Sequence, residues 1–381
     1  MDLQEIRKNI DRIDDQLIEL FAERMKVSAD VAEYKMKNNM PVLDAKRERD
    51  KLNTLTEKTP AEFQEYIRVL YSVIFEVSRS YQHKLLATST ELSEKIANAI
   101  ENTPKLFPPS ATVACQGTEG AYSQIACEKL FKNPNIVYTA DFEKVFSAIE
   151  SGLCQFGILP LENSTAGSVT KVYELMQKHN FNIVRSTRIK VDHNLYVHPD
   201  VKDISQIKEI VSHEQALNQS MGFIKSLGSV KITPCENTAV AAEMVSKSER
   251  RDIAALASHQ CAELYNLRCL KSSVQDKGNN YTRFICISKN LEIYPGANKT
   301  SVMMTIPHKP GALYKVLARF YSLGINLIKL ESRPLPDKDF EFMFYFDLET
   351  SIYSPEFMQL MAEFENICET FCYLGSYAEV I

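Results

Sequence analysis

A basic side chain interrupts the apolar pattern near the start of the chain, and its position predicts an anion-binding pocket. Apolar residues recur every three or four positions from Ile6 to Tyr34, as on a helix that packs against a partner. Arg24 occupies one position of this series. An arginine is costly there unless it is paired. It therefore predicts either a buried salt bridge to a neighbouring helix or a cavity for an anionic ligand.

Other polar residues favour the ligand. Lys35 follows Arg24 by 11 positions, which is about 20° around an α-helix, so the two share one face. Arg7 lies about 100° from that face, so only the partner chain's copy could serve the same pocket. Segments that follow Pro41 add further cationic, acidic and neutral candidates: Asp44, Arg47, Glu48, Ser78 and Gln82. Together they suit an anionic ligand.

Three polar motifs adjoin apolar strands in the middle of the chain. They are GILPLENSTAGSV (157–169), VSHEQALNQ (211–219) and NNYTRF (279–284). Turn chemistry would explain any one of them alone. No GxGxxG sequence is present, which disfavours a nicotinamide-dependent dehydrogenase.

The elements that must position these residues fall into segments with different sequence patterns. Residues 1–88 predict an all-α bundle. We expect it to form a homodimer, because its long first helix cannot bury its own apolar seam. The polar, proline-ended range 89–110 predicts a helical or loose linker. Residues 111–290 alternate short apolar strands with helices, an α/β pattern with two lobes. Residues 300–381 predict a βαββαβ, ferredoxin-like order.

Composition and charge restrict the partners. The 381 residues carry a formal net charge of −5, which disfavours nucleic acid. The nine cysteines include no CxxC pair and suit a reducing cytosol. The polar N-terminus and the lack of a long apolar run predict a cytoplasmic protein without a membrane span. No metal or cofactor is expected.

Residues 1–85 resemble the small all-helical chorismate mutases. The resemblance rests on Arg7, Arg24 and Lys35 at their spacing, on PVLDAKRERD and on S-x-x-x-Q. It implies an intertwined homodimer in which each pocket takes one arginine from the opposite chain. It further implies that Arg7, Arg24 and Arg47 bind carboxylates and that Lys35 and Gln82 donate to the ether oxygen. Glu48 and the backbone near Asp44 would take the hydroxyl, and Ser78 would help to position the substrate.

The middle segment resembles prephenate dehydratase, through GTEGAYS, PLENS, SHEQAL and the TRF triplet in that order. The fold implied is a two-lobed domain like a periplasmic binding protein. Thr282 would donate to the leaving hydroxyl, and Arg283 would hold a carboxylate or shape the site. Glu162 would be the acid, if burial raises its pKa, or would orient Thr282. The implied cleft residues are Glu162, Asn163, Ser168, Ser212, His213, Gln215 and Gln219.

The last segment resembles the ACT-type amino-acid-sensing domain, through PGAL and ESRP on the βαββαβ frame. The resemblance implies L-phenylalanine binding and feedback inhibition. The implied effector residues are Gly311, Ala312, Leu313, Asn326, Leu330, Glu331 and Ser332. The whole chain thus resembles the bifunctional chorismate mutase–prephenate dehydratases, which make phenylpyruvate from chorismate.

Two alternatives remain at this point. A non-catalytic amino-acid sensor would share the two-lobed and ferredoxin-like architecture, with the helices as a dimerisation coil. A plain coil has no use for the cationic face of Arg24 and Lys35, which favours catalysis. A mutase with a degenerate dehydratase half is the second alternative, and the intact TRF triplet argues against it.

Overall fold

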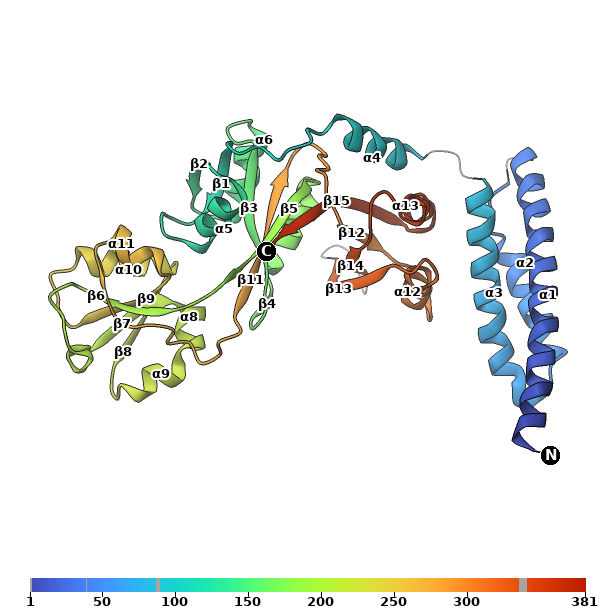
Figure 1. The fold of residues 1–381 in the computed structure, drawn as a ribbon, viewed down its shortest axis with the longest axis horizontal. Helices are drawn as coiled ribbons and strands as arrows, with labels where there is room; N and C mark the ends of the chain where they lie inside the picture. Colours follow the sequence, from blue (N-terminus) through green and yellow to red (C-terminus); the bar gives the residue numbers. More distant parts are fainter. Residues whose placement is uncertain (1, 39, 87–89, 336–340) are drawn as a thin grey trace.

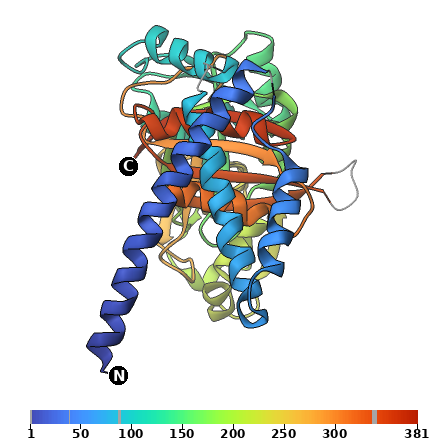
Figure 2. The same cartoon turned by 90° about the vertical axis from the view of Figure 1, so that its right-hand side faces the viewer.

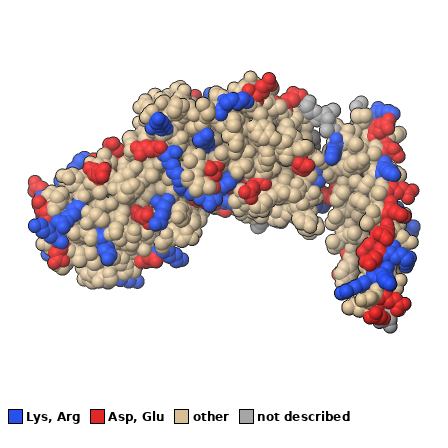
Figure 3. Space-filling view, viewed as in Figure 1, with Lys and Arg blue, Asp and Glu red and all other residues tan. Residues whose placement is uncertain are grey.

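The chain was analysed as a computed structural model, which describes residues 2–38, 40–86, 90–335 and 341–381, without the side chains of residues 365–367. A helical region lies at one end of the elongated molecule and a two-lobed α/β region lies at the other (Figure 1). Basic and acidic side chains are interspersed over the visible face (Figure 3). None of the described helices is long and apolar enough to cross a membrane.

The N-terminal region consists of helices whose apolar surface is largely uncovered. Its helices are α1 (Leu3–Lys37), α2 (Ala45–Glu57), the short η1 (Ala61–Phe63) and α3 (Gln64–Leu85). The N-terminal half of α1 projects away from all other elements (Figure 2). Leu17, Leu20 and Val27 of its seam are each more than half exposed. The predicted all-α region is therefore present, and its first helix is left without a covering partner in one chain.

The α/β region has two lobes, as predicted. The first lobe contains β1 (Thr112–Gln116), α5 (Tyr122–Leu130), β2 (Asn135–Thr139), α6 (Phe142–Glu150), β3 (Phe156–Asn163), β4 (Gly167–Ser168), α7 (Thr170–His179), β5 (Asn182–Lys190) and β11 (Tyr281–Ser288). The second lobe contains β6 (Asn194–Val197), η2 (Ile204–Gln206), β7 (Glu209–His213), α8 (Glu214–Gln219), α9 (Met221–Ser226), β8 (Lys231–Cys235), α10 (Thr238–Lys247), β9 (Ile253–Ala257), α11 (Gln260–Leu264) and β10 (Arg268–Lys271). Residues 191–193 and 272–280 connect the lobes.

The C-terminal region has the predicted βαββαβ order. Its elements are β12 (Lys299–Thr305), α12 (Ala312–Ser322), β13 (Asn326–Pro334), β14 (Phe342–Glu349), α13 (Pro355–Ile367) and β15 (Thr370–Val380). The strands lie in the order β13-β14-β12-β15, with β13 at the edge. Both helices pack on one face of this sheet, where Val316, Phe320 and Phe364 meet Val302 and Phe346.

This C-terminal sheet is continuous with the sheet of the first lobe. The end of β15 runs parallel to β5, with Ala378 opposite Arg185. The approach requires glycine at position 375, where φ is +126° and an added Cβ would overlap the backbone of Ile183. Met343 and Tyr345 of β14 also share one apolar core with the first lobe. The two regions are therefore joined by backbone pairing as well as by packing.

The range expected to be a linker contains helix α4 (Glu91–Asn102). Thr90 caps its N-terminus by accepting a hydrogen bond from the amide of Ser93. Ile96 and Ala99 are buried in the same core as Phe357 and Leu360 of α13. The helix is thus packed as part of the C-terminal region, although it precedes the α/β region in sequence.

Candidate functional site

Among the described residues, the arginine in the apolar seam has a hydroxyl as its hydrogen-bond partner and no ion-pair partner. Arg24 is half-buried, and Nη1 donates a hydrogen bond to Oγ of Ser78 on α3. Its guanidinium lies 5.8 Å from the ring centroid of Phe75. No carboxylate forms a salt bridge with Arg24 within the described part of the chain. Burial lowers the pKa of Arg24, although Tyr71 and Glu48 oppose that change. The geometry favours the anion cavity over the buried salt bridge.

The predicted partners of Arg24 converge from all three helices. Lys35 donates to the carbonyl of Val42, just before α2, and burial lowers its pKa. Asp44 caps α2, accepting a hydrogen bond from the amide of Arg47 at 3.0 Å. The charge of Glu48 opposes the lowering of the pKa of both Arg24 and Lys35, so Glu48 is near both residues. Side chains from α1, α2 and α3 thus surround one polar site.

Gln82 is the clearest sign that this site is built to bind a ligand. Its side chain is buried, but its Oε1 atom has no hydrogen-bond partner among the described residues. A buried polar atom without a partner is costly. A bound molecule with a hydrogen-bond donor, or rotation of the amide toward a ligand acceptor, would remove that cost.

One predicted residue of this set lies apart from the others. Arg7 is exposed on the projecting half of α1, about 26 Å along the helix axis from Arg24. Arg47 is exposed at the start of α2, where its charge contributes to lowering the pKa of Lys35. The distance excludes Arg7 from the pocket of its own chain, as the angular argument also did. Its proposed role therefore depends on a second chain.

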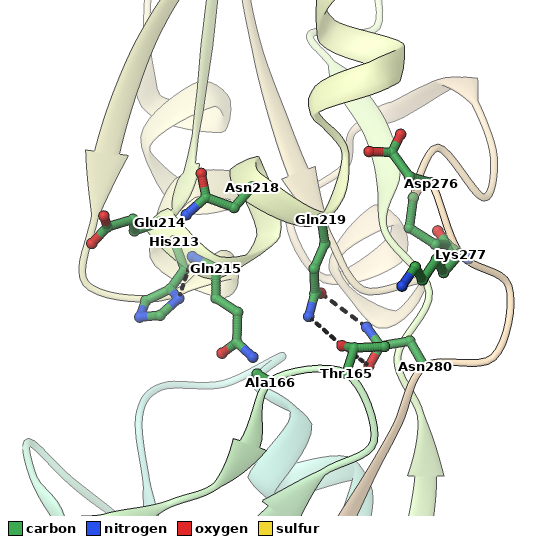
Figure 4. Close-up of a pocket in the computed structure, with 11 residues that line it drawn as sticks. Thr165, Ala166, His213, Glu214, Gln215, Asn218, Gln219, Asp276, Lys277 and Asn280 are labelled. Carbon is green, nitrogen blue, oxygen red and sulfur yellow. Dashed lines mark hydrogen bonds between the residues drawn. The ribbon is translucent and has the colours of Figure 1, made fainter.

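A second site is a cavity of about 490 Å³ between the two lobes of the α/β region. Figure 4 shows its walls, which come from the β3–β4 turn, from α8 and from the connecting segment before β11. His213, Gln215 and Gln219 line it, as predicted. His213 also caps α8, because its Nδ1 accepts a hydrogen bond from the amide of Gln215 at 3.2 Å. The volume is ordinary for a site that binds a small molecule.

A hydrogen-bonded network connects Thr282 to this cavity. Thr282 is not among the lining residues, but its Oγ1 accepts a hydrogen bond from Nδ2 of Asn163 at 2.9 Å. The same nitrogen lies 2.8 Å from Oδ1 of Asn280, whose Nδ2 donates to Oε1 of Gln219 at 2.9 Å. Gln219 in turn donates to Oγ1 of Thr165. Thr282 therefore lies at the end of a network that reaches the cavity wall.

Three predicted cleft residues face elsewhere. Ser212 is fully buried within the second lobe, where its Oγ donates to the carbonyl of Leu256 at 2.6 Å. Glu162 and Ser168 instead contact the C-terminal region, through Lys329. The physical reason is strand alternation, because Asn163 faces the cavity and its neighbour Glu162 must face the other side. None of these three side chains is among those that line the interlobe cavity.

Arg283 also points away from the cavity. It is 4% exposed, and Nη1 forms ion pairs with Asp347 at 2.7 Å and with Glu162 at 3.0 Å. Burial alone would lower the pKa of Arg283, but Tyr377, Asp347 and Glu162 together raise it. The guanidinium is therefore charged and already occupied. It is not placed to hold a carboxylate in the interlobe cavity.

The predicted effector residues divide between two faces of the C-terminal sheet. Gly311 has a φ of +80° and caps α12, so Ala312 and Leu313 begin that helix. Asn326 donates to Oε2 of Glu349 at 2.9 Å. Leu330 and Ser332 are exposed on β13, whereas Glu331 points to the opposite face and binds Ser168. Glu331 therefore does not share a surface with Leu330 and Ser332.

Several polar residues at these sites were not predicted. Arg79 forms ion pairs with Glu48 and Glu76, and lies directly after the predicted Ser78. Asn280, within the NNYTRF motif, joins the network at Thr282. Lys277 brings a lysine ammonium to the cavity lining. Its position five residues before Thr282 was the available signal, but only the folded connection shows that it reaches the cleft.

Comparisons with known proteins match two different families to two different parts of the chain. Residues 6–83 match the family chorismate mutase type II, and residues 113–292 match the family prephenate dehydratase. A bifunctional chorismate mutase/prephenate dehydratase from Enterobacter agglomerans is 30% identical over 380 residues, covering 98% of this chain and 95% of that protein. An Arabidopsis thaliana arogenate dehydratase/prephenate dehydratase is 33% identical over 314 residues, covering 79% and 80%.

A solved structure matches a large part of the fold. It is a prephenate dehydratase from Arthrobacter aurescens in complex with L-Phe, 25% identical, with a TM-score of 0.64. The match covers 70% of this chain and 90% of that one.

Proposed function

Because this chain belongs to the bifunctional chorismate mutase/prephenate dehydratase family, we propose that its helical site rearranges chorismate to prephenate and its interlobe site converts prephenate to phenylpyruvate. The observation that carries the first activity is the unpaired Arg24 beside Ser78, Lys35 and Gln82. The Thr282 network at the cavity carries the second. The product of one site would be the substrate of the other.

The first reaction needs positioning and charge stabilisation. Chorismate carries two carboxylates and rearranges within itself, so no nucleophile or proton transfer is required. Arg24 would bind a carboxylate, while Lys35 and Gln82 would donate to the ether oxygen as negative charge grows there. The lowered pKa values of Arg24 and Lys35 report desolvation, and a dianionic substrate would offset it. Ser78 would hold Arg24 in place, and Arg79 would hold Glu48 near the substrate hydroxyl.

The second reaction expels a ring hydroxyl and carbon dioxide together. The departing hydroxyl takes up a proton and leaves as water, while the electrons of the breaking carbon–carboxylate bond complete the aromatic ring. Thr282 suits the role of donor, because Asn163 donates to its oxygen and leaves its own proton for the substrate. Within the described residues, no hydrogen bond from the Thr282 hydroxyl is present. Glu162 would then support Thr282 only indirectly, through Arg283.

The mutase site requires two chains. The exposed seam of α1 needs a partner, and Arg7 cannot reach Arg24 of its own chain. We expect a homodimer in which Arg7 crosses to the partner's pocket. Mixing inactive Arg7→Ala and Lys35→Ala chains should then recover activity. Random pairing makes half of the dimers mixed, and each has one of two pockets whole, so recovery approaches about a quarter of parental activity.

The control for that experiment is subunit exchange itself. Differently tagged chains should be co-purified to show that mixed dimers formed. Mixed dimers without mutase activity would contradict the shared pocket.

Lys277 would bind a carboxylate of prephenate in the interlobe cavity. It supplies a lysine ammonium to that lining, whereas Arg283 is occupied on the other face of the sheet. Lys277→Met should raise KM for prephenate about threefold to tenfold with little change in kcat, because an exposed charge-assisted contact is worth roughly 1 kcal/mol. Steady-state kinetics at two salt concentrations would measure this. Lys271→Met, on exposed β10, is the control, and an equal KM in both variants would refute the role.

The C-terminal region is proposed as an ACT-type domain that binds L-phenylalanine and inhibits the dehydratase. The support is the βαββαβ order, the left-handed Gly311 before α12, and the likeness to a dehydratase in complex with L-Phe. The amides at the start of α12 would receive the amino-acid carboxylate. Leu313 and Leu330 would contact the ring, and Asn326 and Ser332 would fix the amino-acid end. Calorimetry with phenylalanine tests this, and absence of binding to the full chain would exclude it.

The direct test of the proposed function is incubation of the full chain with chorismate. Prephenate should form first and phenylpyruvate should follow, while supplied prephenate should yield phenylpyruvate directly. A chain that binds phenylalanine but converts neither substrate would be a sensor instead.

A further inference from the structure

A cluster of buried charges joins the dehydratase lobe to the C-terminal sheet. Its members come from both regions: Glu162, Ser168, Arg283, Ser301, Lys329, Glu331, Asp347 and Tyr377. Arg283, Asp347 and Tyr377 are each at most 5% exposed. Charged groups are rarely buried so deeply without mutual pairing. The cluster therefore fixes one mutual arrangement of the two regions, which nonspecific apolar packing would not do.

The first half of the cluster holds the strand that carries Thr282. Arg283 follows Thr282 on β11, so the two side chains face opposite sides of the sheet. Arg283 is held by Asp347 at 2.7 Å and by the hydroxyl of Tyr377 at 2.9 Å. Ser301 binds both Asp347 and Tyr377. Movement of the C-terminal sheet would therefore be transmitted to the backbone beside Thr282.

The second half holds the hairpin that forms a wall of the cavity. Ser168 on β4 donates to Oε2 of Glu331 at 2.9 Å and accepts from Nζ of Lys329 at 3.0 Å. The turn between β3 and β4 carries Thr165, which lines the cavity and is joined to Asn163. Lys329 also binds Glu162, the residue directly before Asn163. Both ends of this hairpin are thus tied to β13.

The two faces of strand β13 differ in their surroundings. Lys329 and Glu331 are half-buried toward the dehydratase lobe, and Leu330 and Ser332 are exposed on the opposite face. A ligand held by that exposed face would act on the same strand that holds the hairpin. Such a physical connection can couple two sites energetically. A claim of coupling also requires a measured coupling energy.

Resting on the proposed dehydratase activity, we propose that Asp347 and Glu331 of the C-terminal region are positioning residues for that reaction, Asp347 through Arg283 and Glu331 through Ser168. They touch neither substrate nor the cavity. They set the place of Thr282 and of the β3–β4 turn relative to the bound substrate. The C-terminal region thus supplies part of the support of the dehydratase site.

The test is a double-mutant cycle measured with supplied prephenate. Ser168→Ala and Glu331→Gln should each lower dehydratase kcat about threefold to tenfold, with KM changed less than twofold. The double variant should lose less than the product of the two single effects, because both changes weaken the same contact between Ser168 and Glu331. Tyr377→Phe, which removes one hydroxyl without a change of volume, should lower kcat in the same manner through Arg283.

The mutase rate of the same chains serves as the folding control and should stay at the parental value. Arg188→Met is the matched control, since it removes an ion pair between a half-exposed arginine and Glu379 across the same junction. It should leave dehydration unchanged. The proposal is overturned if the effects of Ser168→Ala and Glu331→Gln on kcat multiply in the double variant. It is also overturned if kcat stays at the parental value in these variants and in Tyr377→Phe. A parental chain that cannot dehydrate prephenate would instead refute the proposed function.

Discussion

Arg24→Ala should remove most of the mutase activity and leave dehydration of supplied prephenate nearly intact. The guanidinium is half-buried and pairs with no carboxylate in the described ranges of the chain, so its charge is available to the substrate. A charge-assisted contact that strengthens in the transition state is worth roughly 3–4 kcal/mol, or about two to three decades in rate. Chorismate consumption, followed at saturating and subsaturating substrate, would measure the loss in kcat and in kcat/KM.

The matched control is Lys26→Ala, which removes an exposed cation two residues away on a different face of α1. Its mutase rate should match that of the parent. Circular dichroism should show equal helix content in both variants. A folded Arg24→Ala chain that still converts chorismate at the parental rate would place the pocket elsewhere.

The prediction of the mutase site rests on information that is local in the sequence. The spacing of Arg24 and Lys35 on one helix fixes their common face, whatever the rest of the chain does. The prediction could not identify Arg79 as the partner of Glu48, because two separate helices bring those side chains together. The seam of α1 is exposed in one chain, and the sequence of one chain does not show what covers it.

The dehydratase site was harder because the motifs lie on strands. Asn163 and Thr282 face the cavity network, whereas their neighbours Glu162 and Arg283 face the C-terminal sheet. A sequence motif identifies adjacent residues as a group. Only the pairing of the strands decides which of their side chains reaches the cleft. The same alternation separates Glu331 from Leu330. The contact partners of Glu162 and Arg283 lie far along the chain, so no local pattern could have indicated them.

Thr282→Val should lower phenylpyruvate formation by about two to three decades while weakening prephenate binding much less. Valine keeps the shape of threonine but removes the hydroxyl, and loss of one donor to developing negative charge has effects of that size. It also leaves Nδ2 of Asn163 with Asn280 as its remaining acceptor, so the network to the cavity should persist. Thr282→Ser retains the hydroxyl and should keep much more activity.

Thr300→Val, which removes a buried hydroxyl bonded to Ser376 in the C-terminal sheet, controls for the general effect of such a change. Rapid-quench measurement of a single turnover would separate the chemical step from substrate binding. If the valine and serine variants lose equal activity, Thr282 has a packing role and the donor must be sought among the groups that line the cavity.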